Sequence, residues 1–267
     1  MLKARILTAA VLLGVFLAAL FLLPQAGWNG LVVAVLAMAA WEWAGLAGLR
    51  AARRGVYAAA IAMAAAWVAR ESGALLGWTY IAAGAFWLVL APVWLWRRPI
   101  FRIPVIPLAA GVIVLVPSAA AMAALRESSP GLLLAIMAVV WISDTAAYFF
   151  GHRFGRRKLA AAISPGKTWE GVYGALAAVT VYAIGWLAAG GSQPAALREF
   201  PLAQLWFVML LIGLAALGVM GDLLESQMKR QAGVKDSGTV LPGHGGILDR
   251  IDALLPVLPL AALAFLS

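Results

Sequence analysis

The chain has 267 residues, of which 64% are hydrophobic and 12% charged, and its mean hydropathy is +0.95. This balance excludes an ordinary soluble domain, in which about half the residues are apolar and about a quarter charged, and it predicts an all-α, polytopic bundle of membrane helices. The net charge of +9 does not indicate nucleic-acid binding, because the basic residues lie in short clusters between apolar runs. The absence of cysteine excludes disulfides and thiolate metal sites.

Apolar runs long enough to cross a bilayer, which takes roughly 20 helical residues, follow one another along the chain. We expect about nine spans, at 6–23, 28–48, 56–69, 75–96, 105–125, 131–150, 171–189, 202–221 and 248–266. The first could instead be a cleaved signal peptide, but it is long for one and no A-x-A site follows Leu23. In the ninth, Pro256 and Pro259 predict a kink rather than a break, provided that neighbouring helices shelter the freed carbonyls.

The basic residues predict the orientation, because cytoplasmic loops of membrane proteins are enriched in Lys and Arg. With the N-terminus in the cytoplasm and the C-terminus in the periplasm, all of the 20 basic residues except Arg70, Arg126 and Arg198 lie on the cytoplasmic side. The two long loops, 151–170 and 222–247, then also face the cytoplasm. Both are rich in glycine, hydroxyl and charged residues, as functional loops often are.

Three acidic residues, Glu42, Asp144 and Asp222, lie inside predicted spans, where each costs roughly 2.5–3.5 kcal/mol to insert. All three are in the cytoplasmic third or at the end of their helices. An ion-coupled transporter could use them as cation ligands, although its site would more naturally lie at the membrane midplane. That alternative leaves the charged segment 229–252 without a role.

Helical periodicity groups further polar side chains with Asp222. If the eighth helix continues past the membrane, Asp222, Glu225, Ser226 and Lys229 share one face. The alternative is a solvated helix end with ordinary ion pairs.

The segment from Lys229 to Asp252 contains seven charged residues and five glycines. Closely spaced glycines let a backbone approach phosphate oxygens. Asp249 and Asp252 follow at the start of the last helix, where capping alone could explain Asp252 but explains Asp249 less well. Carboxylates from two helix ends suit Mg²⁺, and nearby cations would neutralise the remaining phosphate charge. Those cations are Lys229, Arg230, Lys235 and Arg250.

The other long loop carries Ser164, Lys167 and Thr168, which are typical phosphate donors. Glu170 could meet a metal, a sugar hydroxyl or Lys167. The loop lacks the spacing of a Walker A motif. A basic cluster that only sets membrane orientation is the alternative interpretation.

These blocks resemble a known family. The stretch from Ser226 through Lys229-Arg230, Lys235-Asp236 and His244-Gly245-Gly246 to Asp252 resembles the signature of phosphatidate cytidylyltransferases, or CDP-diacylglycerol synthases. The runs SPGKTWEG (164–171) and SDTAAYFFG (143–151) are similar to two further blocks of that family. The resemblance covers residues 141–252.

The resemblance implies transfer of the cytidylyl group of CTP to phosphatidate, giving CDP-diacylglycerol and pyrophosphate, at the cytoplasmic face of a bacterial inner membrane. It also implies Mg²⁺, with K⁺ as a candidate second cation, and a homodimer in contact with membrane lipid. Residues 1–130 would supply packing and dimer contacts, and residues 131–267 the catalytic region. A polyprenol-type lipid kinase that uses CTP is the nearest alternative.

The resemblance assigns the metal to Asp222 and Asp249 and gives Asp144 a less defined place in the site. We expect catalytic roles for Asp222, Asp249, Lys229 and Arg230. We expect substrate-binding roles for Asp144, Ser164, Lys167, Thr168, Glu170, Ser226, Lys235, Asp236, His244, Gly245, Gly246, Arg250 and Asp252. The phosphate of phosphatidate is already anionic and needs no general base, so His244 is expected to bind or support rather than to take a proton.

Overall fold

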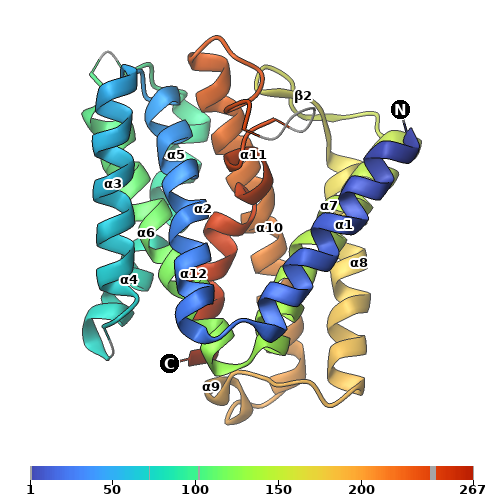
Figure 1. Cartoon of the computed structure of the whole chain (residues 1–267). Helices are drawn as coiled ribbons and strands as arrows, with labels where there is room; N and C mark the ends of the chain where they lie inside the picture. The colour runs from blue at the N-terminus through green and yellow to red at the C-terminus, as the bar shows by residue number, and fades with distance from the viewer. Residues whose placement is uncertain (1, 72, 102, 241–244, 267) are drawn as a thin grey trace.

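The computed structural model describes residues 2–71, 73–101, 103–240 and 245–266, and most of these are helical (Figure 1). The N-terminal half contains α1 (Leu2–Leu22), α2 (Gln25–Leu46), α3 (Ala51–Val68), α4 (Ala74–Ala85), the π-helical turn η1 (Phe86–Leu90), α5 (Ala91–Arg97) and α6 (Val105–Ser128). The C-terminal half contains α7 (Pro130–Phe154), α8 (Trp169–Ala188), α9 (Ala195–Arg198), α10 (Ala203–Gln231), α11 (Leu248–Ile251) and α12 (Leu254–Leu266).

Each expected span coincides with a helical segment, which confirms the helical membrane-protein class. In the described part of the chain, six segments are long and apolar enough to cross a membrane: α2, α4 continued through α5, α6, α7, α8 and α10. Shorter apolar stretches occur at 13–22 and in α12. The alanine-rich α3 carries Arg53 and Arg54 in its first turn, so its composition does not identify it as a span.

Helix α10 joins two groups of packed helices. On one side α2, α3, α4, α6 and α12 pack against one another, and on the other α7 and α8 form a close pair. Helix α10 contacts α7 and α8 as well as α12. The C-terminal end of α10 therefore lies where both groups meet, and this end carries the predicted acidic and basic residues.

The expected ninth span is broken, not only kinked. Helix α11 is separated from α12 by a turn at 252–253. Pro256 and Pro259 cannot donate to the carbonyls four residues earlier, which are those of Asp252 and Leu255. The Leu255 carbonyl accepts a hydrogen bond from Ser118 Oγ of α6 at 2.7 Å, so a neighbouring helix shelters it as expected.

The all-α expectation was incomplete, because the loop predicted at 151–170 contains a β-hairpin. Strand β1 (Lys158–Ala160) pairs antiparallel with β2 (Ser164–Thr168), with Lys158 opposite Thr168. Thr168 then caps α8 by accepting a hydrogen bond from the Gly171 N–H at 3.2 Å. The loop predicted at 222–247 is also shorter, because its first ten residues belong to α10.

Candidate active site

A cavity of about 740 Å³ lies between α7, the hairpin, α8 and α10. Its volume is in the range of small-molecule binding pockets. The described residues that line it are Asp144, Ala147, Tyr148, Gly151, His152, Gly155, Lys158, Leu159, Ser164, Gly166, Lys167, Thr168, Gly171, Val172, Val219 and Asp222. The cavity thus brings together predicted site residues from three separate parts of the sequence.

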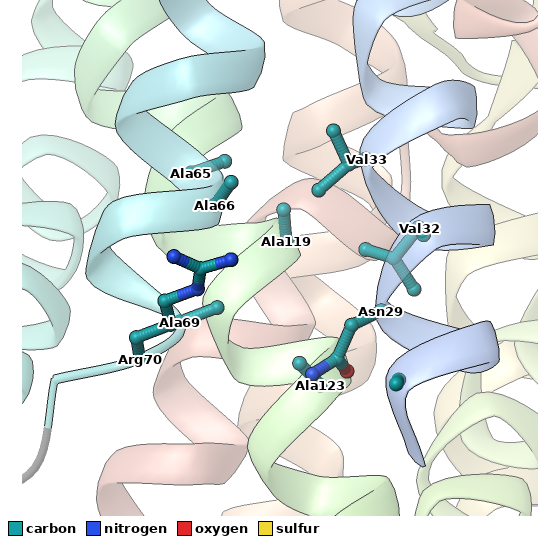
Figure 2. A pocket seen from close by; sticks show the side chains of 11 residues that line it. Asn29, Val32, Val33, Ala65, Ala66, Ala69, Arg70, Ala119 and Ala123 are labelled. Atoms are coloured by element: carbon teal, nitrogen blue, oxygen red, sulfur yellow. The ribbon is translucent and has the colours of Figure 1, made fainter. Parts of the chain in front are cut away.

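A second cavity, of about 360 Å³, lies between α2, α3 and α6 (Figure 2). Alanine and valine side chains form most of its wall, and Asn29 and Arg70 supply its polar groups. No predicted site residue is among those that line it in the described structure. The larger cavity is therefore the candidate active site.

Helix α7 supplies one wall of the site through residues three or four positions apart. Asp144, Tyr148, Gly151 and Gly155 recur at this spacing and line the cavity. The rings of Tyr148 and His152 stack with their centroids 6.1 Å apart and their planes 8° apart. Tyr148, His152 and Lys158 were not among the predicted site residues. The helical spacing from Asp144 could have identified Tyr148 within the SDTAAYFFG run.

Glycine brings α7 and α8 close together beneath the hairpin. A Cβ atom on Gly171 would lie 2.8 Å from the Ala147 carbonyl oxygen and 3.4 Å from the Gly151 Cα. The contact with the Ala147 carbonyl oxygen is too close for a Cβ atom unless backbone atoms move. Strand β2 of the hairpin contacts both helices, and Lys167 on this strand pairs with Asp222.

Helix α10 presents the predicted stripe of polar residues as one continuous helix, which confirms that the eighth helix continues. Asp222 lies on the cavity wall, forms an ion pair with Lys167 Nζ at 2.6 Å, and accepts a hydrogen bond from Ser226 Oγ at 3.1 Å. One turn further on, Lys229 Nζ contacts Glu225 Oε2 at 2.8 Å. Helix α10 therefore takes part in two neighbouring ion pairs, one with the hairpin and one within the helix.

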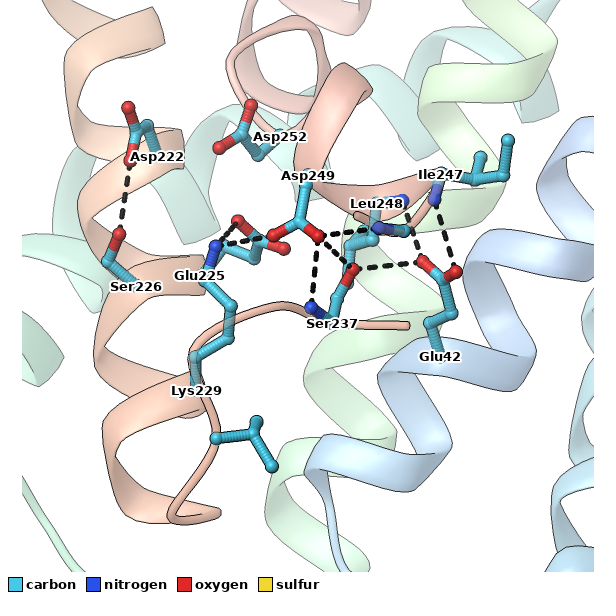
Figure 3. A network of polar contacts seen from close by, with 12 residues as sticks. Glu42, Asp222, Glu225, Ser226, Lys229, Ser237, Ile247, Leu248, Asp249 and Asp252 are labelled. Carbon is cyan, nitrogen blue, oxygen red and sulfur yellow. Dashed lines mark hydrogen bonds and ion pairs between the residues drawn. The ribbon is translucent and has the colours of Figure 1, made fainter. Parts of the chain in front are cut away.

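Asp249 connects Lys229 of α10 to Ser237 in the loop that follows α10 (Figure 3). Its carboxylate lies 2.6 Å from Lys229 Nζ and accepts hydrogen bonds from the Gly246 N–H at 2.8 Å and from the N–H and Oγ of Ser237, both at 3.0 Å. The Lys229 ammonium group and these hydrogen-bond donors compensate the negative charge of the partly buried Asp249 carboxylate.

Asp249 is not among the described residues that line the cavity, whereas Asp144 and Asp222 are. Within the described structure no three Asp, Glu or His side chains form a ready-made metal site. Mg²⁺, however, commonly uses one or two carboxylates together with substrate phosphates. Asp222 and Asp249 each already hold a cationic ammonium group, so the chemistry of these donors fits a hard divalent cation.

The remaining predicted residues take varied positions. Arg230 donates to the Ile163 and Val234 carbonyls at 3.3 and 3.2 Å and so ties the hairpin to the loop after α10. Glu170 accepts hydrogen bonds from the N–H groups of Arg156 and Arg157 at 3.0 and 3.1 Å, and not from Lys167. Lys235, Asp236 and Arg250 are exposed, as is Arg230.

At the start of the last helix, Asp252 accepts a hydrogen bond from the Ala253 N–H at 2.8 Å. Gly245 adopts a positive φ of 82°, and its neighbour Gly246 donates to Asp249. His244 lies outside the described residues.

The three acids of the transporter alternative do not share one site. Asp144 and Asp222 face the cavity, but Glu42 accepts hydrogen bonds from the backbone N–H groups of Ile247 and Leu248 at 3.1 and 2.8 Å. Glu42 therefore holds a loop in place.

Comparison with known proteins identifies the family. The model of the cytidylyltransferase family matches residues 3–267. The chain is 39% identical to a phosphatidate cytidylyltransferase of Pseudomonas aeruginosa, over 98% of this chain and 96% of that protein. It is 32% identical to the enzyme of the same name from Haemophilus influenzae, over 97% and 96%. The chain therefore belongs to the cytidylyltransferase family.

Proposed function

We propose that this chain transfers the cytidylyl group of CTP to phosphatidate, forming CDP-diacylglycerol and pyrophosphate for phospholipid synthesis. The observation that carries the proposal is the cavity in which Ser164, Lys167 and Thr168 of the hairpin face Asp144 and Asp222 of two apolar helices. Relatives similar over nearly their whole length bear the name phosphatidate cytidylyltransferase. The cavity and the relatives point to the same reaction.

The reaction needs positioning and charge neutralisation more than proton transfer. A phosphate oxygen of phosphatidate forms a bond to the α-phosphorus of CTP, and the bond from that phosphorus to the oxygen bridging to the β-phosphate breaks. The attacking phosphate is already anionic, so no general base is required. Lys167 and the hydroxyls of Ser164 and Thr168 are placed to bind phosphate oxygens, which aligns the reactants and stabilises the leaving pyrophosphate.

We further propose that Asp222 and Asp249 hold Mg²⁺, with K⁺ as a candidate second cation. A bound divalent cation would neutralise phosphate charge and favour departure of pyrophosphate. With the cation bound, Lys167, which now pairs with Asp222, would be available to the nucleotide phosphates, whereas Lys229 would keep its contact with Glu225. The pairing of each carboxylate with an ammonium group supports a cation-binding role.

The membrane arrangement of the proposal has nine crossings, an N-terminus in the cytoplasm and a C-terminus in the periplasm of a bacterial inner membrane. The distribution of Lys and Arg supports this orientation, in which the active site would face the cytoplasm. Soluble CTP then reaches the cavity from the cytosol, while the acyl chains of phosphatidate remain in the bilayer. We propose a homodimer as the functional unit.

Purified protein in detergent, incubated with Mg²⁺ and CTP labelled at the α-phosphate, tests this function. We expect a labelled nucleotide-bearing lipid and release of pyrophosphate when phosphatidate is supplied. Polyprenol, supplied with CTP labelled at the γ-phosphate, is the comparison acceptor. Transfer of the γ-phosphate to polyprenol would support the lipid kinase and contradict the proposal, as would the absence of reaction with either acceptor.

A further inference from the structure

Glu42 is a buried acid far in sequence from every predicted site residue. It lies on α2 in the N-terminal half, and only 3% of its surface is exposed. An unpaired carboxylate at such a position would be costly, because burial removes its hydration. Glu42 instead meets hydrogen-bond donors from the segment 237–248, some 200 positions later (Figure 3).

Both carboxylate oxygens of Glu42 are occupied. Oε1 accepts a hydrogen bond from the Ile247 N–H at 3.1 Å, and Oε2 accepts from the Leu248 N–H at 2.8 Å and from Ser237 Oγ at 3.0 Å. Ile247 is the N-cap and Leu248 the first residue of α11, the short helix that carries Asp249. Glu42 of α2 thus contacts both Ser237, in the loop after α10, and the start of α11.

Two glycines allow the segment to approach Glu42. A Cβ atom on Gly238 would lie 2.3 Å from Glu42 Oε1, and one on Gly246 would lie 2.4 Å from Glu42 Oε2 and 2.2 Å from Ser237 Oγ. A side chain at either position would therefore force Glu42 out of its present place. Glycine at positions 238 and 246 therefore allows the backbone to lie against Glu42, apart from any contact of the backbone with phosphate.

Ser237 joins Glu42 directly to Asp249. Its hydroxyl lies 3.0 Å from Glu42 Oε2 and 3.0 Å from Asp249 Oδ2, and its N–H also donates to Asp249. The chain of contacts therefore runs from α2 through Ser237 to Asp249, and from Asp249 to Lys229 of α10. A displacement of Glu42 would be passed on to the carboxylate proposed to hold the metal.

We infer that Glu42 is a positioning residue for cytidylyl transfer: it anchors Ser237 and residues 247–248 on α2 and sets the place of Asp249 without touching substrate. This inference rests on the proposed function for its effect on turnover, but the anchoring itself can be measured separately.

Glu42→Gln is the sharpest test, because the amide has nearly the same shape as the carboxylate. Either orientation of the amide directs its NH₂ group at a backbone N–H, so one of the two contacts at the start of α11 is lost. We expect kcat to fall about 10- to 100-fold while KM for CTP stays near that of the wild type, since the cavity residues that bind CTP are untouched. Glu127→Gln, an identical change at an exposed position, is the matched control and should keep wild-type kcat.

Limited trypsin digestion supplies a measurement that does not depend on activity. Lys235 is exposed two residues before Ser237, and we expect faster cleavage after it in Glu42→Gln than in the wild type or Glu127→Gln. Adding Ser237→Ala to Glu42→Gln should lower kcat less than the two single effects combined, because both changes interrupt one connection.

The outcomes separate the two proposals. Wild-type kcat and unchanged cleavage in Glu42→Gln would overturn the positioning role and leave the function intact. A fall in kcat explained entirely by loss of folded, monodisperse protein would also overturn it, since that result would indicate a general structural role. If the wild-type protein did not transfer the cytidylyl group, the function would fail, and the cleavage rates would still decide whether Glu42 anchors the segment.

Discussion

Lys167 and Asp222 form the contact that joins the hairpin to α10 across the cavity. Their charged groups are 2.6 Å apart, and both side chains are partly exposed, so water screens the pair and its contribution to stability is small. We expect the pair to matter more for substrate binding than for folding, because a lysine held at the cavity wall would be available to an incoming triphosphate.

Lys167→Ala should accordingly raise KM for CTP by about 10- to 100-fold, with a smaller effect on kcat, because a charged contact to phosphate contributes on the order of 1.5–3 kcal/mol. Arg97→Ala removes one positive charge from an exposed residue that is not among those lining the cavity, and should change KM much less. Steady-state kinetics at varied CTP concentration measure both. Equal effects of the two substitutions would contradict the assignment of the cavity to CTP.

Sequence reasoning found those cavity residues whose chemistry is unusual for their surroundings. Asp144 and Asp222 were identified as acids in apolar helices, and Ser164, Lys167 and Thr168 as phosphate donors in a long loop. Tyr148 and His152 were missed, because an aromatic or basic residue near a membrane surface is common. The anchoring role of Glu42 could not be predicted either, since its donors are backbone N–H groups brought to it by the tertiary fold.

At the level of elements, α10, which carries Asp222, closely approaches the turn between α11, which carries Asp249, and α12. A Cβ atom on Gly221 would lie 2.4 Å from the Asp252 carbonyl oxygen and 2.9 Å from Pro256 Cδ. Pro256 leaves that carbonyl without its usual donor, and Gly221 lets α10 pack directly against it. The proximity of Asp222 to the last helix thus depends on a residue without a side chain.

Gly221→Ala should lower stability by about 1–3 kcal/mol, because backbone atoms must move to admit the methyl group, and it should reduce turnover through the adjacent Asp222. Gly213→Ala is the matched control on the same helix, since a Cβ there meets nothing within 4 Å. Thermal unfolding in detergent and the transferase assay give the two readouts. Equal melting temperatures for the two variants would show that α10 and the turn are not in tight contact.

The elements themselves were predictable to different degrees. Hydropathy located the helices, because long apolar runs must form internal hydrogen bonds in a bilayer. It did not reveal the hairpin, whose strands of three and five residues carry no alternating pattern. The break at 252–253 was also missed, because proline shows where a donor is lost and not how the chain accommodates the loss.

For the whole molecule, the orientation in the membrane decides whether the cavity is open to cytosolic CTP. The chain contains no cysteine, so single cysteines can be introduced without removing any. Ala161→Cys in the exposed hairpin turn and Ser192→Cys in the loop after α8 lie on opposite sides of the proposed membrane. A membrane-impermeant maleimide applied to intact cells should label Ser192→Cys alone. Labelling of Ala161→Cys from outside would reverse the proposed topology.

The most direct test of the central claim is the rate of cytidylyl transfer to phosphatidate by purified Asp222→Asn and Asp249→Asn, measured beside the wild-type protein with labelled CTP and Mg²⁺. If carboxylates from α10 and α11 govern the charge at the reacting phosphates, each substitution should lower turnover by about 10²-fold or more, while membrane insertion and helical content stay unchanged. Substantial transfer by either variant would contradict the account.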